Sequence, residues 1–252
     1  MKVIFLIASN VLKEIFRKKD MYVLFFLLLL LMVYLANTAF FGGQDIYRYM
    51  KEIGLGMVFL FSLLISVPFT AKLMIEEIAS KTIYPLLAKP IERVHILCGK
   101  FLGGILVSWS SFSIFYILFA LISILKEGIV APFLLLQVYV SGLIMLLALN
   151  SLVICLSVFC TFSTTVSLSY IVYFLMSWFG NQLRTSFENI PFFGQIIYYL
   201  LPHFEFFDLR HRLIHFWDPL PAWVMLWIIG YGIFYSVILL YCALYKFKKR
   251  WL

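Results

Sequence analysis

The sequence predicts an all-α polytopic membrane protein with about six transmembrane helices. Hydrophobic residues make up 64% of the 252 residues and charged residues only 13%, whereas about 25% of the residues in a soluble domain are charged. The apolar runs are long and continuous, as spanning helices of about 20 residues require. A transmembrane β-barrel would instead show alternating segments of about ten residues. The sequence therefore argues against both a soluble domain and a barrel.

The basic residues lie mainly beside the apolar runs. The net charge is +8, but flanking Lys and Arg residues set the orientation of spanning helices. We therefore expect membrane lipids, and not nucleic acid, around this chain. The cysteines show neither zinc-site spacing nor a disulfide framework, and they fall in or next to apolar runs. They are Cys98, Cys155, Cys160 and Cys242.

Residues 1–20 are expected to form an amphipathic helix in the membrane interface. Apolar residues such as Ile4, Ile7 and Val11 recur at three- and four-residue spacing among basic residues, a pattern typical of interfacial helices. An ordinary positive flank without regular structure is the alternative. Because no short apolar core with a small-residue cleavage site is present, we expect the first apolar run to be a retained anchor.

Six apolar segments then follow within a single membrane domain. They cover residues of about 21–41, 53–75, 101–125, 132–159, 166–181 and 222–245. Pro68 is expected to kink the second segment. The third segment carries small residues that allow close approach between helices. These are Gly103, Gly104, Ser108 and Ser111.

The division between the fourth and fifth spans follows from length. Residues 128–182 contain no Asp, Glu, Lys or Arg. As one helix they would extend about 80 Å, against a hydrocarbon core of about 30 Å. The chain must therefore fold back, and we expect the turn in the run of small polar residues at 160–165. Residues 184–221 then form a long outer loop before the last span.

The distribution of positive charge predicts the orientation. Basic residues concentrate in the N-terminal segment, in the connection between the second and third spans, and at the C-terminus. By the positive-inside rule these three regions face the cytoplasm. Both termini and the segment 77–100 are therefore expected on the cytoplasmic side.

The segment 77–100 is the most informative part of the chain. A proline is tolerated only in the first turn of a helix, so a helix containing Pro85 should begin near Thr82, whose hydroxyl can cap it. The residue before Pro90 is biased away from helical geometry, so this helix should end by Ala88. About two turns are too short to be stable alone in water. We therefore expect a partner surface to hold the apolar side chains Ile83, Leu86 and Leu87, although a solvated loop is the alternative.

This segment resembles the connection between spans two and three in the permease subunits of ABC type-2 exporters. That family's pattern is roughly E-x-x-x-G-T-x-x-x-L-L-x-x-P-I-x-R-x-x-x-x-x-G-K. The matching residues here are Glu77, Thr82, Leu86, Leu87, Pro90, Ile91, Arg93, Gly99 and Lys100. The resemblance extends to the basic N-terminal segment, the six spans and the stretch Leu200–Asp208, which is similar to the family's re-entrant helices before the last span.

The resemblance implies a membrane-spanning permease that works as a dimer with an identical or homologous protomer. A separate ABC ATP-binding subunit, carrying ATP and Mg²⁺, would dock on the segment 77–100, which includes a short coupling helix. The residues implied in this coupling are Glu77, Thr82, Ile83, Leu86, Leu87, Lys89, Pro90, Arg93 and Lys100. The family's usual setting is the bacterial cytoplasmic (inner) membrane.

The residues themselves give no sign of an enzyme. Gly99-Lys100 lacks the upstream glycine and the following Ser or Thr of a phosphate-binding loop, so no cofactor is expected in this chain and ATP hydrolysis must occur elsewhere. A non-transporting membrane scaffold that recruits a cytoplasmic partner is the main alternative. An intramembrane metalloprotease is a weaker one, suggested by Glu76-Glu77 and by Phe207 with His211.

Two further sets of polar residues are candidates for sites. The outer loop holds three histidines that could bind a metal ion, although a membrane-interfacial loop explains them as well; they are His203, His211 and His215. Within the spans, polar residues either join helices or contact a substrate, and we favour the first role. The main ones are Asn37, Asn150 and Ser151.

Overall fold

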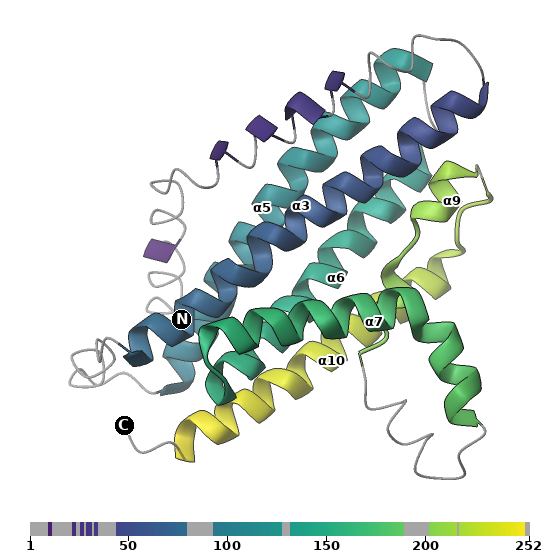
Figure 1. The fold of residues 1–252 in the computed structure, drawn as a ribbon. Coiled ribbons are helices and arrows are strands. Elements are labelled where there is room, and N and C mark those ends of the chain that lie inside the picture. The colour runs from purple at the N-terminus through teal and green to yellow at the C-terminus, as the bar shows by residue number, and fades with distance from the viewer. Residues whose placement is uncertain are drawn as a thin grey trace.

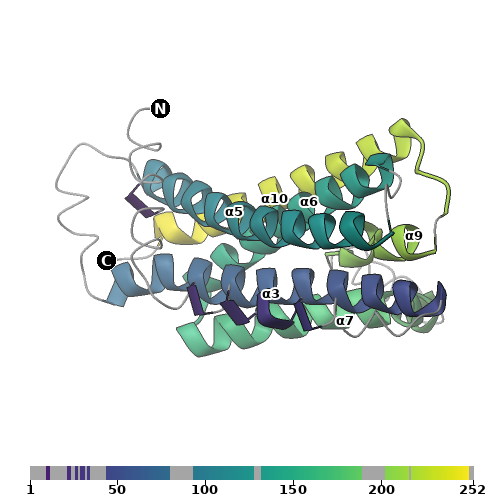
Figure 2. The ribbon, with the colours of Figure 1, turned by 90° about the horizontal axis from the view of Figure 1, so that it is seen from above.

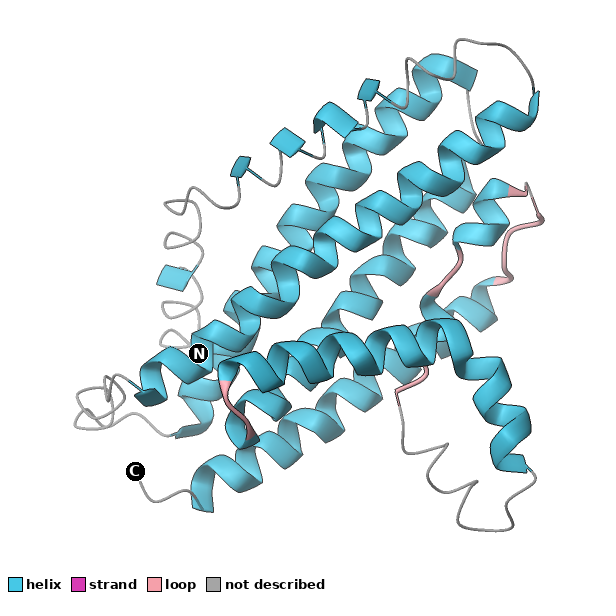
Figure 3. Cartoon of the chain, in the orientation of Figure 1, coloured by secondary structure: helices cyan, strands magenta, loops and turns pink. Residues whose placement is uncertain are grey.

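A computed structural model of the chain describes most of the predicted membrane domain (Figure 1). The described residues are 44–79, 93–127, 132–188, 202–215 and 217–249, together with 10, 11, 22, 23, 26, 27, 29–31, 33 and 34. Within these residues the structure contains helices and no strands (Figure 3). The prediction of an all-α protein is therefore confirmed for the described part of the chain.

In the described part of the chain, the bundle contains five long helices, and two short ones lie between α7 and α10. The long helices are α3 (Gln44–Ala79), α5 (Arg93–Glu127), α6 (Pro132–Phe159), α7 (Phe162–Glu188) and α10 (Ala222–Lys249). The short ones are the 3₁₀-helix η2 (Phe204–Phe207) and α9 (Arg210–Ile214). Among the described residues, five helices are long and apolar enough to cross a membrane.

Five of the six predicted spans fall in these long helices, and α6 has the predicted bounds. The predicted span at 21–41 lies largely outside the described residues, as does most of the predicted interfacial helix at 1–20. The other four helices extend further than predicted: α3 begins at Gln44 and ends at Ala79, α5 begins at Arg93, α7 continues to Glu188, into the predicted outer loop, and α10 continues to Lys249. A helix can continue past its apolar run because its backbone hydrogen bonds do not depend on the bilayer.

The helix α6 lies at the centre of the bundle. Of its apolar span, 67% is buried inside the protein, against 22% for α7 and 17% for α10. In the view from above, α3 and α7 lie on one side and α5, α6 and α10 on the other (Figure 2). The sparsely covered faces of α7 and α10 are apolar over most of their length and suit contact with lipid or with another protein.

One end of the bundle gathers parts of the chain that are distant in sequence. A cluster of buried side chains joins the end of α3, the beginning of α5 and the ends of α6 and α10, and we call this the inner end. The cluster consists of Met74, Leu97, Phe101, Ile105, Ile154, Val158, Ala243 and Phe247. The segment between α3 and α5 and the turn between α6 and α7 therefore belong to the same end, as the predicted topology requires.

The turn between α6 and α7 is very short. Only Cys160 and Thr161 separate the two helices, at the start of the predicted stretch 160–165. Backbone bonds continue through it, because the Cys160 N–H donates to the Leu156 carbonyl over 2.9 Å. The ammonium of Lys246, near the end of α10, lies 5.6 Å from the centroid of the Phe159 ring.

Small residues let the helices approach closely, as predicted for α5. A Cβ atom on Gly104 would lie 3.0 Å from the Thr70 hydroxyl of α3. At the α6–α10 contact, a Cβ atom on Gly232 would collide with Cγ2 of Ile144. Pro68 lies within α3, which continues to Ala79.

Candidate functional site

The predicted coupling segment lies mostly outside the described residues. This applies to Thr82, Ile83, Leu86, Leu87, Lys89 and Pro90. Glu77 belongs to the last turn of α3 and Arg93 is the first residue of α5, so these two helices bracket the segment at the inner end. Lys100 lies in the second turn of α5 and is only 8% exposed within this chain.

A hydrogen-bonded polar cluster lies inside the bundle and joins three helices. Its centre is Asn150 of α6. The amide oxygen of Asn150 accepts hydrogen bonds from the hydroxyls of Ser66 (3.0 Å) and Thr70 (2.5 Å), both on α3. The amide nitrogen donates to the Ser108 hydroxyl of α5 (2.9 Å) and to the Leu146 carbonyl (2.8 Å). The Ser108 hydroxyl is in turn 2.8 Å from that of Ser66.

We call these four residues, Ser66, Thr70, Ser108 and Asn150, the polar hub. All four have side chains that are 0% exposed. In an apolar environment an unsatisfied polar group is costly, so satisfied groups of this kind hold helices together. The favoured role of Asn150 as a link between helices is what the geometry supports. Ser151 bonds only within α6, to the Ala148 carbonyl at 2.7 Å, and Asn37 lies outside the described residues.

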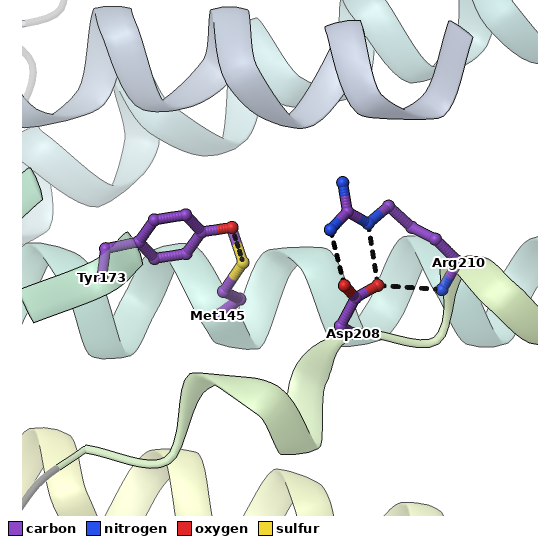
Figure 4. A network of polar contacts seen from close by, with 4 residues as sticks. All are labelled: Met145, Tyr173, Asp208 and Arg210. Atoms are coloured by element: carbon purple, nitrogen blue, oxygen red, sulfur yellow. Dashed lines mark hydrogen bonds and ion pairs between the residues drawn. The ribbon is translucent and has the colours of Figure 1, made fainter. Parts of the chain in front are cut away.

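The opposite end of the bundle, which we call the outer end, is built from η2, α9 and the beginning of α3. An ion pair holds its centre (Figure 4): Arg210 donates from Nε to Oδ1 of Asp208 (2.8 Å) and from a terminal nitrogen to Oδ2 (2.5 Å). The side chains are only 22% and 19% exposed, respectively. The Arg210 guanidinium also lies 5.1 Å from the centroid of the Phe59 ring of α3. The pair thus holds Arg210 in place, and its contact with Phe59 joins α9 to α3.

The electrostatics of this pair favour its charged form. Burial alone would raise the pKa of the Asp208 carboxyl, but the hydrogen bonds and the positive charge of Arg210 more than offset it. The net result is a pKa of Asp208 below its ordinary value. A bidentate arginine–carboxylate pair is among the stronger polar contacts in proteins.

Two further contacts tie α7 and the loop before α10 to α6. The Tyr173 hydroxyl of α7 lies 3.6 Å from the sulfur of Met145 (Figure 4). Gln137 makes a reciprocal pair with the backbone of Leu220, just before α10: its amide donates to the carbonyl (2.7 Å), and its oxygen accepts from the N–H (3.0 Å). The outer end is therefore fastened to the same helix that carries Asn150.

The three histidines do not converge. His203 is 4% exposed and precedes η2, and its backbone N–H donates to the Tyr231 hydroxyl at 3.0 Å. His211 and His215 are exposed at α9 and stack on each other at 6.3 Å between ring centroids. In the part of the chain that the structure describes, no three His, Cys, Asp or Glu side chains are placed to hold a metal ion.

The metalloprotease alternative is not compatible with the helix positions. Glu76 and Glu77 lie in the last turns of α3, whereas His215 at the end of α9 bonds to Arg48, near the beginning of the same helix. About 40 Å of helix separates Arg48 from Glu77. The two halves of the supposed site therefore lie at opposite ends of the bundle.

Sequence reasoning missed the polar contacts at the outer end. Gln137 could have been recognised from the sequence as a candidate for a buried hydrogen bond, because it is an amide in an otherwise apolar span. The pairing of Asp208 with Arg210 was hinted at only by their closeness in sequence. The partnership of Asn150 with Ser66, Thr70 and Ser108 depends on the register between three helices, which the sequence does not display.

Together these features define a polytopic helical membrane protein whose central helix links a buried polar hub to the outer elements. A family model described as ABC-2 family transporter protein matches residues 5–251. The chain therefore belongs to the ABC-2 transporter family, as an ABC type-2 permease. A comparison with curated proteins finds no match.

Proposed function

We propose that this chain forms the translocation pathway of an ABC exporter as a dimer, driven by a separate ATP-binding subunit docked on residues 77–100. The observation that carries the proposal is the convergence of α3 and α5 at the inner end, where they bracket that segment. Family membership implies the ATP-binding partner and the membrane setting. Docking, dimerisation, export and the cytoplasmic placement of the inner end are the proposed parts.

The coupling step follows from how the two helices are held. A partner that displaces residues 80–92 must move the end of α3 and the beginning of α5 together, because both pack in the buried cluster of the inner end. A short helix with an apolar side gains stability from a docking groove that it lacks in water. Closure of the ATP-binding subunits would thereby be transmitted to the spans.

A second protomer is supported by the exposed face of α7. Ser163, Thr164 and Ser167 are exposed there, although a lipid-facing helix would carry apolar residues at such positions. Small and hydroxylated residues are typical of helix–helix contacts in membranes, and they also suit a polar pathway between two protomers. Further along α7, and on α10, the exposed side chains are large and apolar, such as Trp178 and Trp227, so the candidate contact is confined to the first turns of α7.

The test begins with purification in a mild detergent and identification of the proteins that co-purify. We expect an ABC ATP-binding subunit. Charge reversal at the ends of the segment, by Glu77→Lys or Arg93→Glu, should lower transport-coupled ATPase activity about tenfold or more, because misplaced charges at an interface cost several kcal/mol. Membrane insertion should be unchanged.

The matched control is Arg212→Glu, which reverses a charge at the outer end and should leave coupling intact. Full coupled activity in both inner variants would contradict docking on this segment. Co-purification of a partner without any ATP-dependent movement of candidate substrates in vesicles would instead favour a scaffold.

A further inference from the structure

Asn150, the centre of the polar hub, has no spare hydrogen-bonding capacity. A side-chain amide offers two lone pairs on oxygen and two N–H groups. In Asn150 the lone pairs are taken by Ser66 and Thr70, and the two N–H groups by Ser108 and the Leu146 carbonyl. Because nothing is left for a ligand and the side chain is 0% exposed, Asn150 does not bind substrate. Its role must be mechanical.

The polar hub contacts α3 next to Pro68, where this helix is expected to bend most easily. Pro68 lacks a backbone N–H, and its ring crowds the carbonyl four residues earlier, so a helix bends most easily there. Ser66 and Thr70 lie on either side of this proline and donate to the same oxygen of Asn150. The Asn150 amide thus links the two sides of Pro68 and should resist bending of α3 at this residue.

The hub also closes a ring of hydrogen bonds among three helices. The Asn150 amide donates to Ser108 of α5, the Ser108 hydroxyl donates to Ser66 of α3, and Ser66 donates back to Asn150. Hydrogen bonds in such rings strengthen one another in a low-dielectric interior. Each of the two helices that bracket residues 80–92 is therefore tied to α6 at the same place.

From the hub, α6 leads to the outer end. Met145 lies about one and a half turns away and contacts Tyr173 of α7. Gln137, about 20 Å along the helix, holds the Leu220 backbone before α10. A rigid α6 would carry a displacement received at Asn150 to α7 and to the outer loop at Leu220.

We propose that Asn150 is a positioning residue for transport: it makes α3, α5 and α6 move as one body, so that displacement of the inner end reaches the outer loop. This inference rests on the proposed function, since an ATP-binding partner supplies the displacement. Without Asn150, α3 would bend at Pro68, and the inner end would move without the outer end.

The experiment uses the permease with its ATP-binding partner in lipid nanodiscs, with the native cysteines replaced. Single cysteines are introduced by Lys249→Cys, at the inner end, or by Asp218→Cys, at the outer end, and both positions are exposed. The rate of modification by a soluble thiol reagent is compared with and without a non-hydrolysable ATP analogue. In the otherwise unchanged protein we expect both rates to change, by about fivefold, the low end of usual coupling between sites.

The main variant is Asn150→Leu, which keeps the side-chain size and removes the four bonds. We expect the rate change at position 249 to persist and that at position 218 to disappear. The matched control is Ser151→Ala, the adjacent buried residue that bonds only within α6, and it should retain both changes. Thr70→Val preserves the side-chain shape and removes one bond to Asn150, so it should reduce the rate change at position 218. This variant replaces Asn150→Leu in the experiment if the Asn150→Leu protein does not accumulate.

Each outcome is decisive. If the rate change at position 218 persists in Asn150→Leu, or in Thr70→Val where that variant is used instead, the proposed role of Asn150 is overturned and the proposed function is left intact. Equal loss of the outer change in Ser151→Ala also overturns it, because the effect would then be general loosening. No rate change at position 249 in the complex with an intact polar hub would overturn the proposed function itself.

Discussion

Arg48, near the beginning of α3, donates a hydrogen bond to Nδ1 of His215 at the end of α9, over 2.5 Å. A guanidinium can only donate, so Nδ1 of His215 must be unprotonated and act as the acceptor. The imidazole also stacks on Trp217 at 5.7 Å between ring centroids. The outer end is thus closed by a contact between residues that are far apart in the chain.

The first prediction concerns this contact. His215→Phe keeps an aromatic ring and removes the acceptor, so the amides of α9 should exchange with deuterium roughly two- to fivefold faster, since exposed charged contacts contribute about 0.2–1 kcal/mol. His215→Gln retains an acceptor and should exchange more slowly than His215→Phe. The control is His211→Phe, which changes the stacked partner alone. Equal exchange in the His215→Phe and His215→Gln variants would contradict the prediction.

The second prediction concerns the ion pair of the outer end. Asp208→Asn leaves the Arg210 charge largely buried without its carboxylate. Breaking a buried pair costs about 3–5 kcal/mol, and because both side chains are about one-fifth exposed we expect roughly 2–4 kcal/mol. The measurement is thermal unfolding in detergent. The double variant Asp208→Asn, Arg210→Met should recover part of the loss, and no recovery would argue against a paired role.

The third prediction is the pH dependence of the same pair. The pKa of Asp208 is lowered in the folded protein, so its stabilising contribution is complete above the ordinary aspartate pKa of about 3.9. It is lost as the pH falls below that value and through the lowered folded pKa. The difference in melting temperature between the native protein and Asp208→Asn should therefore be constant near neutrality and shrink only in strong acid. A difference that shrinks already near pH 6 would contradict this assignment.

The fourth prediction tests the close approach of α6 and α10. Gly232→Ala places a methyl group against Ile144 and 3.2 Å from the Phe207 ring, and overpacking of this kind costs about 1–3 kcal/mol. Gly230→Ala on the same helix meets no atom within 4 Å and should be neutral or slightly stabilising. Melting temperatures of the two variants give the comparison. Adding Ile144→Ala to Gly232→Ala should relieve part of the strain.

The fifth prediction concerns the fastening of α10 to α6. Gln137→Leu leaves both the N–H and the carbonyl of Leu220 without this partner; a buried unsatisfied group costs about 1–3 kcal/mol, and because Leu220 is half-buried we expect a total near the low end of this range. The melting temperature should fall more than in Ser141→Ala, a buried α6 residue that bonds only to the Val138 carbonyl of its own helix. Equal melting temperatures would show that the loop before α10 is held by other contacts.

The sequence was sufficient for the parts of the fold that depend on polarity along the chain. The helix α6 (Pro132–Phe159) lies within the charge-free run of residues 128–182, and its end follows from the small polar residues at 160–165, where the turn was expected. The lateral arrangement was not predictable, because α6 is apolar on all sides and its pattern gives no preferred face. For that reason the partners of Asn150 emerged only from the structure. The predicted coupling residues between 80 and 92 remain predictions.

The short turn between α6 and α7 has a consequence for how the protein is made. Residues 160 and 161 carry no charge, so nothing within the turn itself fixes the side of the membrane on which it emerges. A nearby positive charge comes from Lys246, beside Phe159, and α10 follows the α6–α7 hairpin in the chain. The α6–α7 hairpin would thus depend, for a lasting orientation, on a lysine synthesised some eighty residues later.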